Sequence, residues 1–415
     1  MDKIIEKSIS LIMYGIHKCS GTCLYCSAAS TMYYNEDGNK NTFKFDKEKT
    51  KKRILEYTGV EDDIKNGDSV NLSIDLWGGN PLENFNEFKQ VVDFCKNELK
   101  EFRKIRLHTS GNGLELRDDT KVQYLIDNGV KYQLSHDGLG QYIRTGVIDP
   151  LYWDKTKDNI VRLVELGILD WINTTLNGRN YSFFDNIEFW NKWRRENNLM
   201  DKEITIKLNH LYPGTPPVTK KWIFDDFNPF PQYKSVKPIK KGEELGDLNF
   251  HGKILQNHFH EYRKLGMLFL NPNITQSDEY RPFISYIRDQ LNRWDIIPEG
   301  KELQHFGSCR AFQNGLKDTN FAIDTIGEYC QCNLIDSSAT VKNPAGIRPK
   351  ECETCEYTQQ AECFPCGSEF METCEFNYAW CQVLEEFAQL KASIDALYEE
   401  SENKEPVFCI KNYRL

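Results

Sequence analysis

The sequence predicts an α/β protein built on a parallel sheet. Six short β-type runs alternate with stretches of helical periodicity through the first half of the chain. The predicted strands are residues 8–14, 72–76, 105–109, 132–135, 171–176 and 204–208. Strands that alternate with helices pair in parallel through crossover connections, so six such units imply a parallel sheet. The pattern alone allows either an open, doubly wound sheet or a partial barrel.

Helical periodicity is clearest in three segments between these strands. Apolar residues recur at helical spacing in residues 88–99, 122–126 and 160–164. Gly129 and Gly167 follow the last apolar residues of the second and third segments, where a left-handed helix terminus favours glycine. These three segments are therefore predicted to be helices.

Length, composition and charge limit the class of protein. A chain of 415 residues corresponds to two or three domains at about 150 residues each. Its 40% hydrophobic and 27% charged residues exclude a collagen, a coiled coil and a disordered tail. The chain has no run of about 18 apolar residues and no apolar signal core near its start, so we expect a cytoplasmic protein that does not enter a membrane. The net charge of −10 argues against nucleic acid as the main partner.

An irregular bridge with helices is predicted for residues 211–300. Six prolines interrupt any regular element in its first part, and helical patterns return at residues 253–265 and 283–294. Lysines alternate with aromatic residues in the proline-rich part, a mixture that could hold single-stranded nucleic acid. In the alternative interpretation the aromatic residues pack the loop onto the body and the lysines are solvated.

Cysteine spacing carries the strongest chemical signal. Of 14 cysteines, ten lie beyond residue 300 and three lie close together near the start, which favours metal ligation over disulfides. Cys19, Cys23 and Cys26 follow the first predicted strand in a C-x3-C-x2-C spacing. Three such thiolates could ligate three irons of a 4Fe-4S cluster and leave the fourth iron open. A zinc site is the alternative, although structural zinc sites use four protein ligands.

Two motifs resemble the radical S-adenosylmethionine (SAM) superfamily. The three-cysteine spacing with Tyr25 just before the third cysteine resembles its signature. Gly78, Gly79, Asn80 and Pro81, after the second predicted strand, resemble its Gly-Gly-Glu-Pro motif, with Asn80 in place of Glu. Two glycines let the backbone approach a ligand closely, and their carbonyls can accept hydrogen bonds from an ammonium group.

Further matches lie after the third and fourth predicted strands. Ser110 belongs to a turn that resembles the family's Thr-Asn-Gly turn, and Ser135 begins a segment that resembles its Ser-x-Asp-Gly. The resemblance implies that Ser135 contacts the SAM ribose and Arg144 the SAM carboxylate, which suits a guanidinium. Asp137 could form an acid–base pair with His136, or could bond to its own backbone in the turn.

The resemblance implies a partial (β/α)6 TIM-like barrel over residues 1–210 and a specific radical chemistry. SAM would chelate the open iron, and an electron from a donor such as flavodoxin or ferredoxin would cleave it to a 5'-deoxyadenosyl radical. That radical would abstract a hydrogen atom from the substrate. The protein would position one C–H bond and exclude competing reductants and water.

Residues 301–390 resemble the SPASM extension of radical SAM enzymes, which holds two auxiliary 4Fe-4S clusters. Residues 320–327 resemble the hairpin that precedes its Gly-x4-Cys element, and residues 391–415 are expected to form a helix end and a tail. The implied ligands are Cys352, Cys355, Cys363 and Cys381 for the distal cluster and Cys309, Cys332 and Cys366 for the proximal one. Either Cys330 or Cys374 is the fourth proximal ligand, or that iron is open. Two zinc sites are the alternative.

The resemblance implies an oxidoreductase that oxidises a peptide or protein, or joins its side chains through thioether or carbon–carbon bonds. Asn333 stands where sulfatase-maturing relatives have an Asp that acts as the catalytic base, and Asp336 is the nearest candidate to replace it. The first predicted strand begins at residue 8, so a leader peptide would need the bridge or a separate binding protein. The alternatives are dehydrogenation or epimerisation of a small metabolite, nucleic-acid modification, and a non-enzymatic zinc-binding interaction module.

Overall fold

The computed structural model of the chain describes part of its sequence. The described residues are 3–16, 19–21, 23, 42–141, 144, 148–176, 180, 182–210, 261, 264, 274, 277–284 and 322–330. The predicted bridge lies almost entirely outside them, and so does the predicted SPASM-like domain except for residues 322–330. The domain boundaries therefore remain a prediction.

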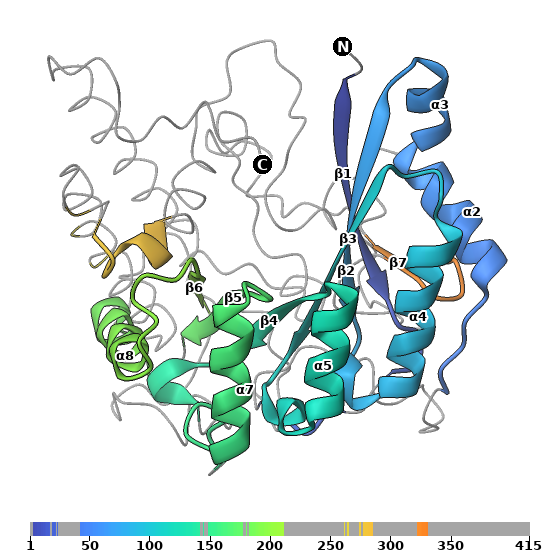
Figure 1. Cartoon of the computed structure of the whole chain (residues 1–415). Helices are drawn as coiled ribbons and strands as arrows, with labels where there is room; N and C mark the ends of the chain where they lie inside the picture. The colour runs from blue at the N-terminus through green and yellow to red at the C-terminus, as the bar shows by residue number, and fades with distance from the viewer. Residues whose placement is uncertain are drawn as a thin grey trace, which may run out of the picture. The chain divides into compact units, whose positions relative to one another are not determined.

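Eight strands form one sheet in the order β6-β5-β4-β3-β2-β1-β7-β8 (Figure 1). They are β1 (Ile4–Ile12), β2 (Ser69–Trp77), β3 (Lys104–Gly111), β4 (Lys131–Ser135), β5 (Leu169–Leu176), β6 (Thr205–His210), β7 (Ala322–Asp324) and β8 (Tyr329–Cys330). Strands β1 to β4 pair in parallel with their neighbours. The six predicted strands are confirmed. Their sequential order is that of a (β/α) barrel, because a doubly wound sheet reverses its strand order at a switch point.

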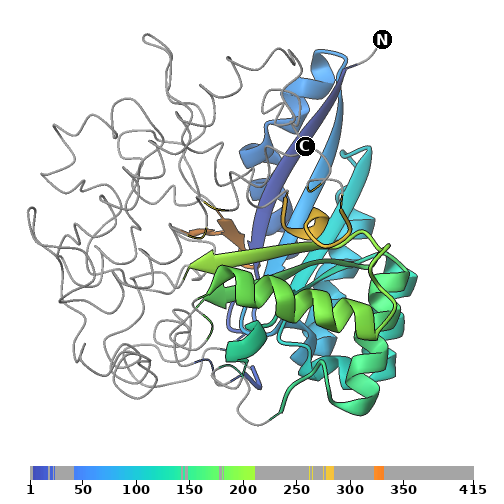
Figure 2. The same cartoon turned by 90° about the vertical axis from the view of Figure 1, so that its left-hand side faces the viewer.

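Helices connect these strands. They are α2 (Lys47–Thr58), α3 (Val60–Lys65), α4 (Phe85–Glu98), α5 (Asp119–Asn128), α7 (Asp154–Glu165) and α8 (Phe183–Glu196), with short 3-10 turns η1 (Pro81–Glu83), η2 (Leu114–Arg117) and η3 (Gly138–Gly140). The three predicted helices are confirmed as α4, α5 and α7. Gly129 and Gly167 both have φ of 62°, as the predicted helix ends require. Figures 1 and 2 show β1, β2 and β3 side by side, with α4 and α5 over one face.

A β-hairpin from far along the chain extends the sheet beyond β1. Strand β7 pairs in parallel with residues 10–12 of β1, and β8 pairs antiparallel with β7. Thr325, in the turn between them, is fully buried. Its Oγ1 donates to the Lys44 carbonyl at 2.6 Å and accepts from the Tyr14 amide at 3.0 Å. The hairpin that the sequence predicts at residues 320–327 is therefore present, and it is fixed to the first strand.

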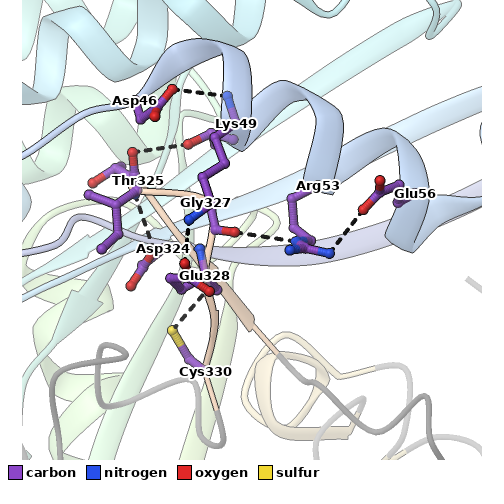
Figure 3. Close-up of polar contacts among 11 residues, drawn as sticks. Asp46, Lys49, Arg53, Glu56, Asp324, Thr325, Gly327, Glu328 and Cys330 are labelled. Atoms are coloured by element: carbon purple, nitrogen blue, oxygen red, sulfur yellow. Dashed lines mark hydrogen bonds and ion pairs between the residues drawn. The ribbon is translucent and has the colours of Figure 1, made fainter.

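Helix α2 holds the other side of the hairpin (Figure 3). The Arg53 guanidinium donates to the Gly327 carbonyl at 3.2 Å and lies 4.5 Å from the centre of the Tyr329 ring. Lys49 pairs with Glu328. Gly327 has φ of 73°, and a Cβ there would lie 2.8 Å from the Lys49 carbonyl carbon, so both backbone conformation and space require glycine. The hairpin is thus clamped between β1 and α2.

The chain divides into two compact units, and the division falls within β5. In the unit that contains α8, Trp190 and Trp193 are fully buried, and Trp190 Nε1 donates to Thr174 Oγ1 at 3.0 Å. Glu261 accepts hydrogen bonds from Ser182 Oγ and from two backbone amides at the start of α8, which satisfies donors that a helix N-terminus leaves open.

No helix within the described residues is long and apolar enough to span a membrane.

Candidate functional site

The carboxyl ends of strands β1 to β4 bring the predicted site residues to one edge of the sheet. Parallel α/β sheets bind ligands at this edge, because the loops after each strand meet there. Cys19 and Cys23 follow β1, Gly78 and Gly79 follow β2, and Arg144 follows β4. This edge is the candidate site.

The loop that carries Cys19 and Cys23 folds around Gly21. A Cβ on Gly21 would lie 3.3 Å from Cys19 Sγ and 3.5 Å from Cys23 Sγ, so both sulfurs border the same point. Neither cysteine is in a disulfide, and both side chains are partly exposed. The third predicted ligand, Cys26, and Tyr25 beside it lie outside the described residues.

Nitrogen donors surround these two sulfurs. The Gly21 amide donates to Cys19 Sγ at 3.4 Å, and Asn112 Nδ2 lies 3.7 Å from the same sulfur. Arg144 Nη1 lies 3.6 Å from Cys23 Sγ. N–H donors and a guanidinium charge stabilise thiolates, which are the form that binds a metal. The described part of the site therefore fits two cysteine ligands of an iron–sulfur cluster.

The two glycines after β2 both have positive φ. Gly78 has φ of 132° and Gly79 has φ of 47°, a region that favours glycine. A Cβ on Gly78 would lie 3.2 Å from the Met13 carbonyl oxygen, so Gly78 also packs closely against the chain after β1. Gly79 is exposed, whereas Asn80 and Pro81 are buried at the start of η1. Gly79 therefore offers backbone at this edge, and the Asn80 side chain points into the protein.

A polar network connects the cysteine loop to the interior. Glu83 Oε1 accepts from the Ser20 amide at 2.7 Å and from Ser20 Oγ at 2.6 Å. Asn80 Nδ2 donates to the same oxygen at 3.1 Å and to Glu115 Oε2 at 2.8 Å. Tyr132 OH donates to Glu115 Oε1 at 2.5 Å. The network thus joins the segments that follow β1, β2 and β3 to strand β4.

Glu115 and Tyr132 form the buried end of this network. Burial raises the pKa of the Glu115 carboxyl, although the hydrogen bonds from Tyr132 and Asn80 oppose the effect. Burial and the neighbouring Glu115 raise the pKa of Tyr132 well above its ordinary value. Gly111 makes room for the pair, because a Cβ there would lie 1.8 Å from Glu115 Oε1. The pair is therefore a fixed, buried anchor for the network that reaches the cysteine loop.

Asp137 and His136 contact different groups. The Asp137 carboxylate is buried and accepts from the Thr175 amide at 3.1 Å, while its backbone carbonyl accepts from Asn180 Nδ2. His136 is buried, and its Nε2 lies 2.9 Å from Asp149 Oδ1. The Asp137 carboxylate thus bonds to the backbone of β5 rather than to that of its own turn, and its catalytic role stays a prediction.

Three of the remaining predicted residues are described by the structure, and the others lie outside the described residues. Ser110 and Ser135 are partly exposed at the ends of β3 and β4, and their contacts with SAM stay a prediction. Cys330 is buried in an apolar cluster with Ile12 and Ala322, against which Trp77 packs. Outside the described residues lie Cys309, Cys332, Cys352, Cys355, Cys363, Cys366, Cys374, Cys381 and Asp336. Among the described residues alone, no three His, Cys, Asp or Glu side chains gather as a metal site.

The sequence did not predict the roles of Ser20, Glu83, Glu115 and Tyr132. Ser20 is a variable position between the first two cysteines and the other three lie outside the motifs, and the bonds in this network join positions 17 to 63 residues apart. The one signal is the unusual Asn80, which has a carboxylate three positions later at Glu83.

Comparisons with known proteins identify the fold. No protein-family model matches the chain, and no curated protein matches it. Among solved structures, native anSMEcpe with bound AdoMet is 15% identical, with a TM-score of 0.53, over 94% of this chain and 100% of that one. Native anSMEcpe with bound AdoMet and Cp18Cys peptide is 14% identical, with a TM-score of 0.52, over 95% and 99%. The chain therefore shares the fold of these structures, including a mixed α/β architecture with a mostly parallel sheet.

Proposed function

We propose that this chain is a radical SAM enzyme that modifies a peptide or protein. The observation that carries the proposal is the placement of Cys19 and Cys23 around Gly21, with Asn112 and Arg144 as nitrogen donors to their sulfurs. This arrangement lies at the edge of the sheet where the left-handed Gly78 and Gly79 also lie. A structural zinc site would require four protein ligands, whereas the N-terminal motif offers three cysteines.

Cys19, Cys23 and Cys26 would hold a 4Fe-4S cluster, and SAM would bind its open iron. When bound, the cluster supplies one electron for the reductive cleavage of SAM. The exposed backbone at Gly79 suits a ligand ammonium group. Arg144 holds a positive charge beside Cys23, which favours the thiolate and suits a ligand carboxylate nearby. Ser110 and Ser135 offer hydroxyl groups at the neighbouring strand ends.

The likeness to anSMEcpe supports a peptide or protein substrate. One of the anSMEcpe structures has a Cp18Cys peptide bound together with AdoMet, and the match extends over nearly the whole of both chains. Full-length similarity also supports a C-terminal auxiliary-cluster domain held by the cysteines from Cys309 to Cys381. Oxidation and side-chain cross-linking are the reactions we propose, with Asp336 and Asp137 as the candidate acid–base residues. A flavodoxin or ferredoxin would supply the electrons.

Metal analysis and SAM cleavage test this proposal. Iron, acid-labile sulfide and zinc are measured per chain after anaerobic reconstitution, for the parent and for a variant with Cys19, Cys23 and Cys26 changed to Ala. We expect about twelve irons to fall to about eight, with loss of 5'-deoxyadenosine formation. Cys95→Ala is the matched control, because Cys95 is a buried thiol on α4 whose pKa is raised by burial. Zinc in place of iron, unchanged by the triple substitution, would contradict the proposal.

A further inference from the structure

We propose that Glu83 is the positioning residue of the cysteine loop, and that Asn80 is an amide because it must join Glu83 to the buried Glu115. This inference rests on the proposed function, since it concerns the loop that would hold the SAM-binding cluster. It assigns a role to the position at which this chain departs from the motif it resembles.

Glu83 holds the residue next to the first cysteine. Its Oε1 accepts both hydrogens that Ser20 can donate, from the backbone amide at 2.7 Å and from the hydroxyl at 2.6 Å. Asn112 Nδ2 donates to Ser20 Oγ at 3.2 Å from the turn after β3. The loop after β1 is therefore fixed from the ends of β2 and β3, by two short bonds to the Glu83 carboxyl group and by one from Asn112 to the Ser20 hydroxyl.

Of asparagine and the glutamate that the motif has at position 80, only asparagine can make the observed bonds. Asn80 is 1% exposed, and its Nδ2 donates to Glu83 Oε1 and to Glu115 Oε2. A glutamate there has no N–H to donate at neutral pH, and it would place a third carboxylate beside two others. The exchange of Glu for Asn thus follows from the two acids that Asn80 contacts.

The far end of the chain of bonds is anchored in the sheet. Glu115 is held by Tyr132 OH at 2.5 Å, and the Tyr132 hydroxyl accepts from the Gly113 amide at 3.1 Å. Tyr132 is a fully buried residue of β4. A continuous path of hydrogen bonds therefore runs from the interior of the sheet through Glu115, Asn80 and Glu83 to Ser20, next to Cys19.

The test compares Glu83→Ala with Glu83→Gln, because glutamine keeps an oxygen that can accept from Ser20. Iron per chain and the EPR change of the reduced protein on adding SAM are measured, together with far-ultraviolet circular dichroism. We expect Glu83→Ala to lose about four irons per chain and the SAM-dependent change, and Glu83→Gln to retain both. Asn80→Asp should behave like Glu83→Ala. Glu165→Ala, which removes an exposed acid at the end of α7, is the matched control.

Two outcomes separate this inference from the proposed function. If the parent chain binds iron and responds to SAM but Glu83→Ala does the same, the positioning role is wrong and the proposed function stands. If the parent chain itself shows no SAM response and its iron does not depend on the N-terminal cysteines, both are wrong. Should Glu83→Ala fail to fold, Glu83→Asp tests the same contact, because its shorter side chain keeps the carboxyl group but draws it away from both Ser20 donors; an unchanged EPR response there would overturn the inference.

Discussion

Replacing Thr325 with valine tests how firmly the hairpin β7–β8 is held by the first strand. Thr325 is fully buried, and its hydroxyl makes two hydrogen bonds to segments more than 280 residues earlier in the chain. Valine preserves the shape of the side chain but removes the acceptor of the Tyr14 amide and the donor to the Lys44 carbonyl. Lys44 is exposed and Tyr14 is partly exposed, so water can reach their backbone groups and each lost bond costs about 0.5–1.5 kcal/mol net; we expect a loss of about 2 kcal/mol for the two bonds together.

Thr50→Val is the matched control, since Thr50 is equally buried. Its hydroxyl donates to the Thr325 carbonyl at 2.9 Å, but that carbonyl also accepts from the Asp46 amide at 2.8 Å. The acceptor therefore keeps a partner in the variant. The expected loss is only about 0.5–1.5 kcal/mol, the net value of one hydrogen bond.

Hydrogen–deuterium exchange, measured by mass spectrometry on peptides that contain Tyr14 and residues 322–330, distinguishes the two variants. A loss of about 2 kcal/mol raises local opening roughly 30-fold, whereas Thr50→Val should raise it no more than about tenfold. Equal exchange in the two variants would refute the assignment of Thr325 as the main attachment of the hairpin.

Three further predictions concern the network and the hairpin. Gly111→Ala should lower the free energy of unfolding by about 1–3 kcal/mol, because its Cβ would overlap Glu115 Oε1. Urea unfolding should show that the same substitution costs less in a chain that already carries Glu115→Ala. Gly327→Ala should speed exchange in residues 322–330, and unchanged exchange would contradict the close approach to Lys49. The folded-state pKa of Glu115 is raised above 4.5, so its stabilising contribution is full below that pH and is lost as pH rises through the folded value. Glu115→Gln, which cannot ionise, should therefore lose less stability than the parent as pH rises, as measured by urea midpoints.

The strands and the strand-end motifs could be predicted because their signals are local. Leu72, Ile74 and Leu76 of β2 are all buried, so a short alternation of apolar and polar residues identifies the strand. Glycines at Gly78, Gly79 and Gly129 also act locally, since a positive φ depends on the residue itself.

Helix α2 could not be predicted from periodicity, for a physical reason. Its buried residues are Thr50, Ile54 and Thr58, so only one of three is apolar. Thr50 bonds to the distant Thr325 carbonyl, and Thr58 Oγ1 bonds to the Ile54 carbonyl. The helix is stabilised by packing against the hairpin and by these bonds, and a hydrophobic pattern does not record them.

The same reasoning explains why the sequence and the structure lead to different interpretations of Asn80. In the sequence, an amide in place of an acid weakens a motif match. In the structure, carboxylates of Glu83 and Glu115 lie on either side of that amide, and each accepts one of its hydrogen bonds. Carboxyl groups are therefore present at this edge of the sheet, but on residues that only the fold brings together. A departure from a motif must accordingly be judged by the side chains that surround the position, because the chemistry of one residue depends on what its neighbours can donate or accept.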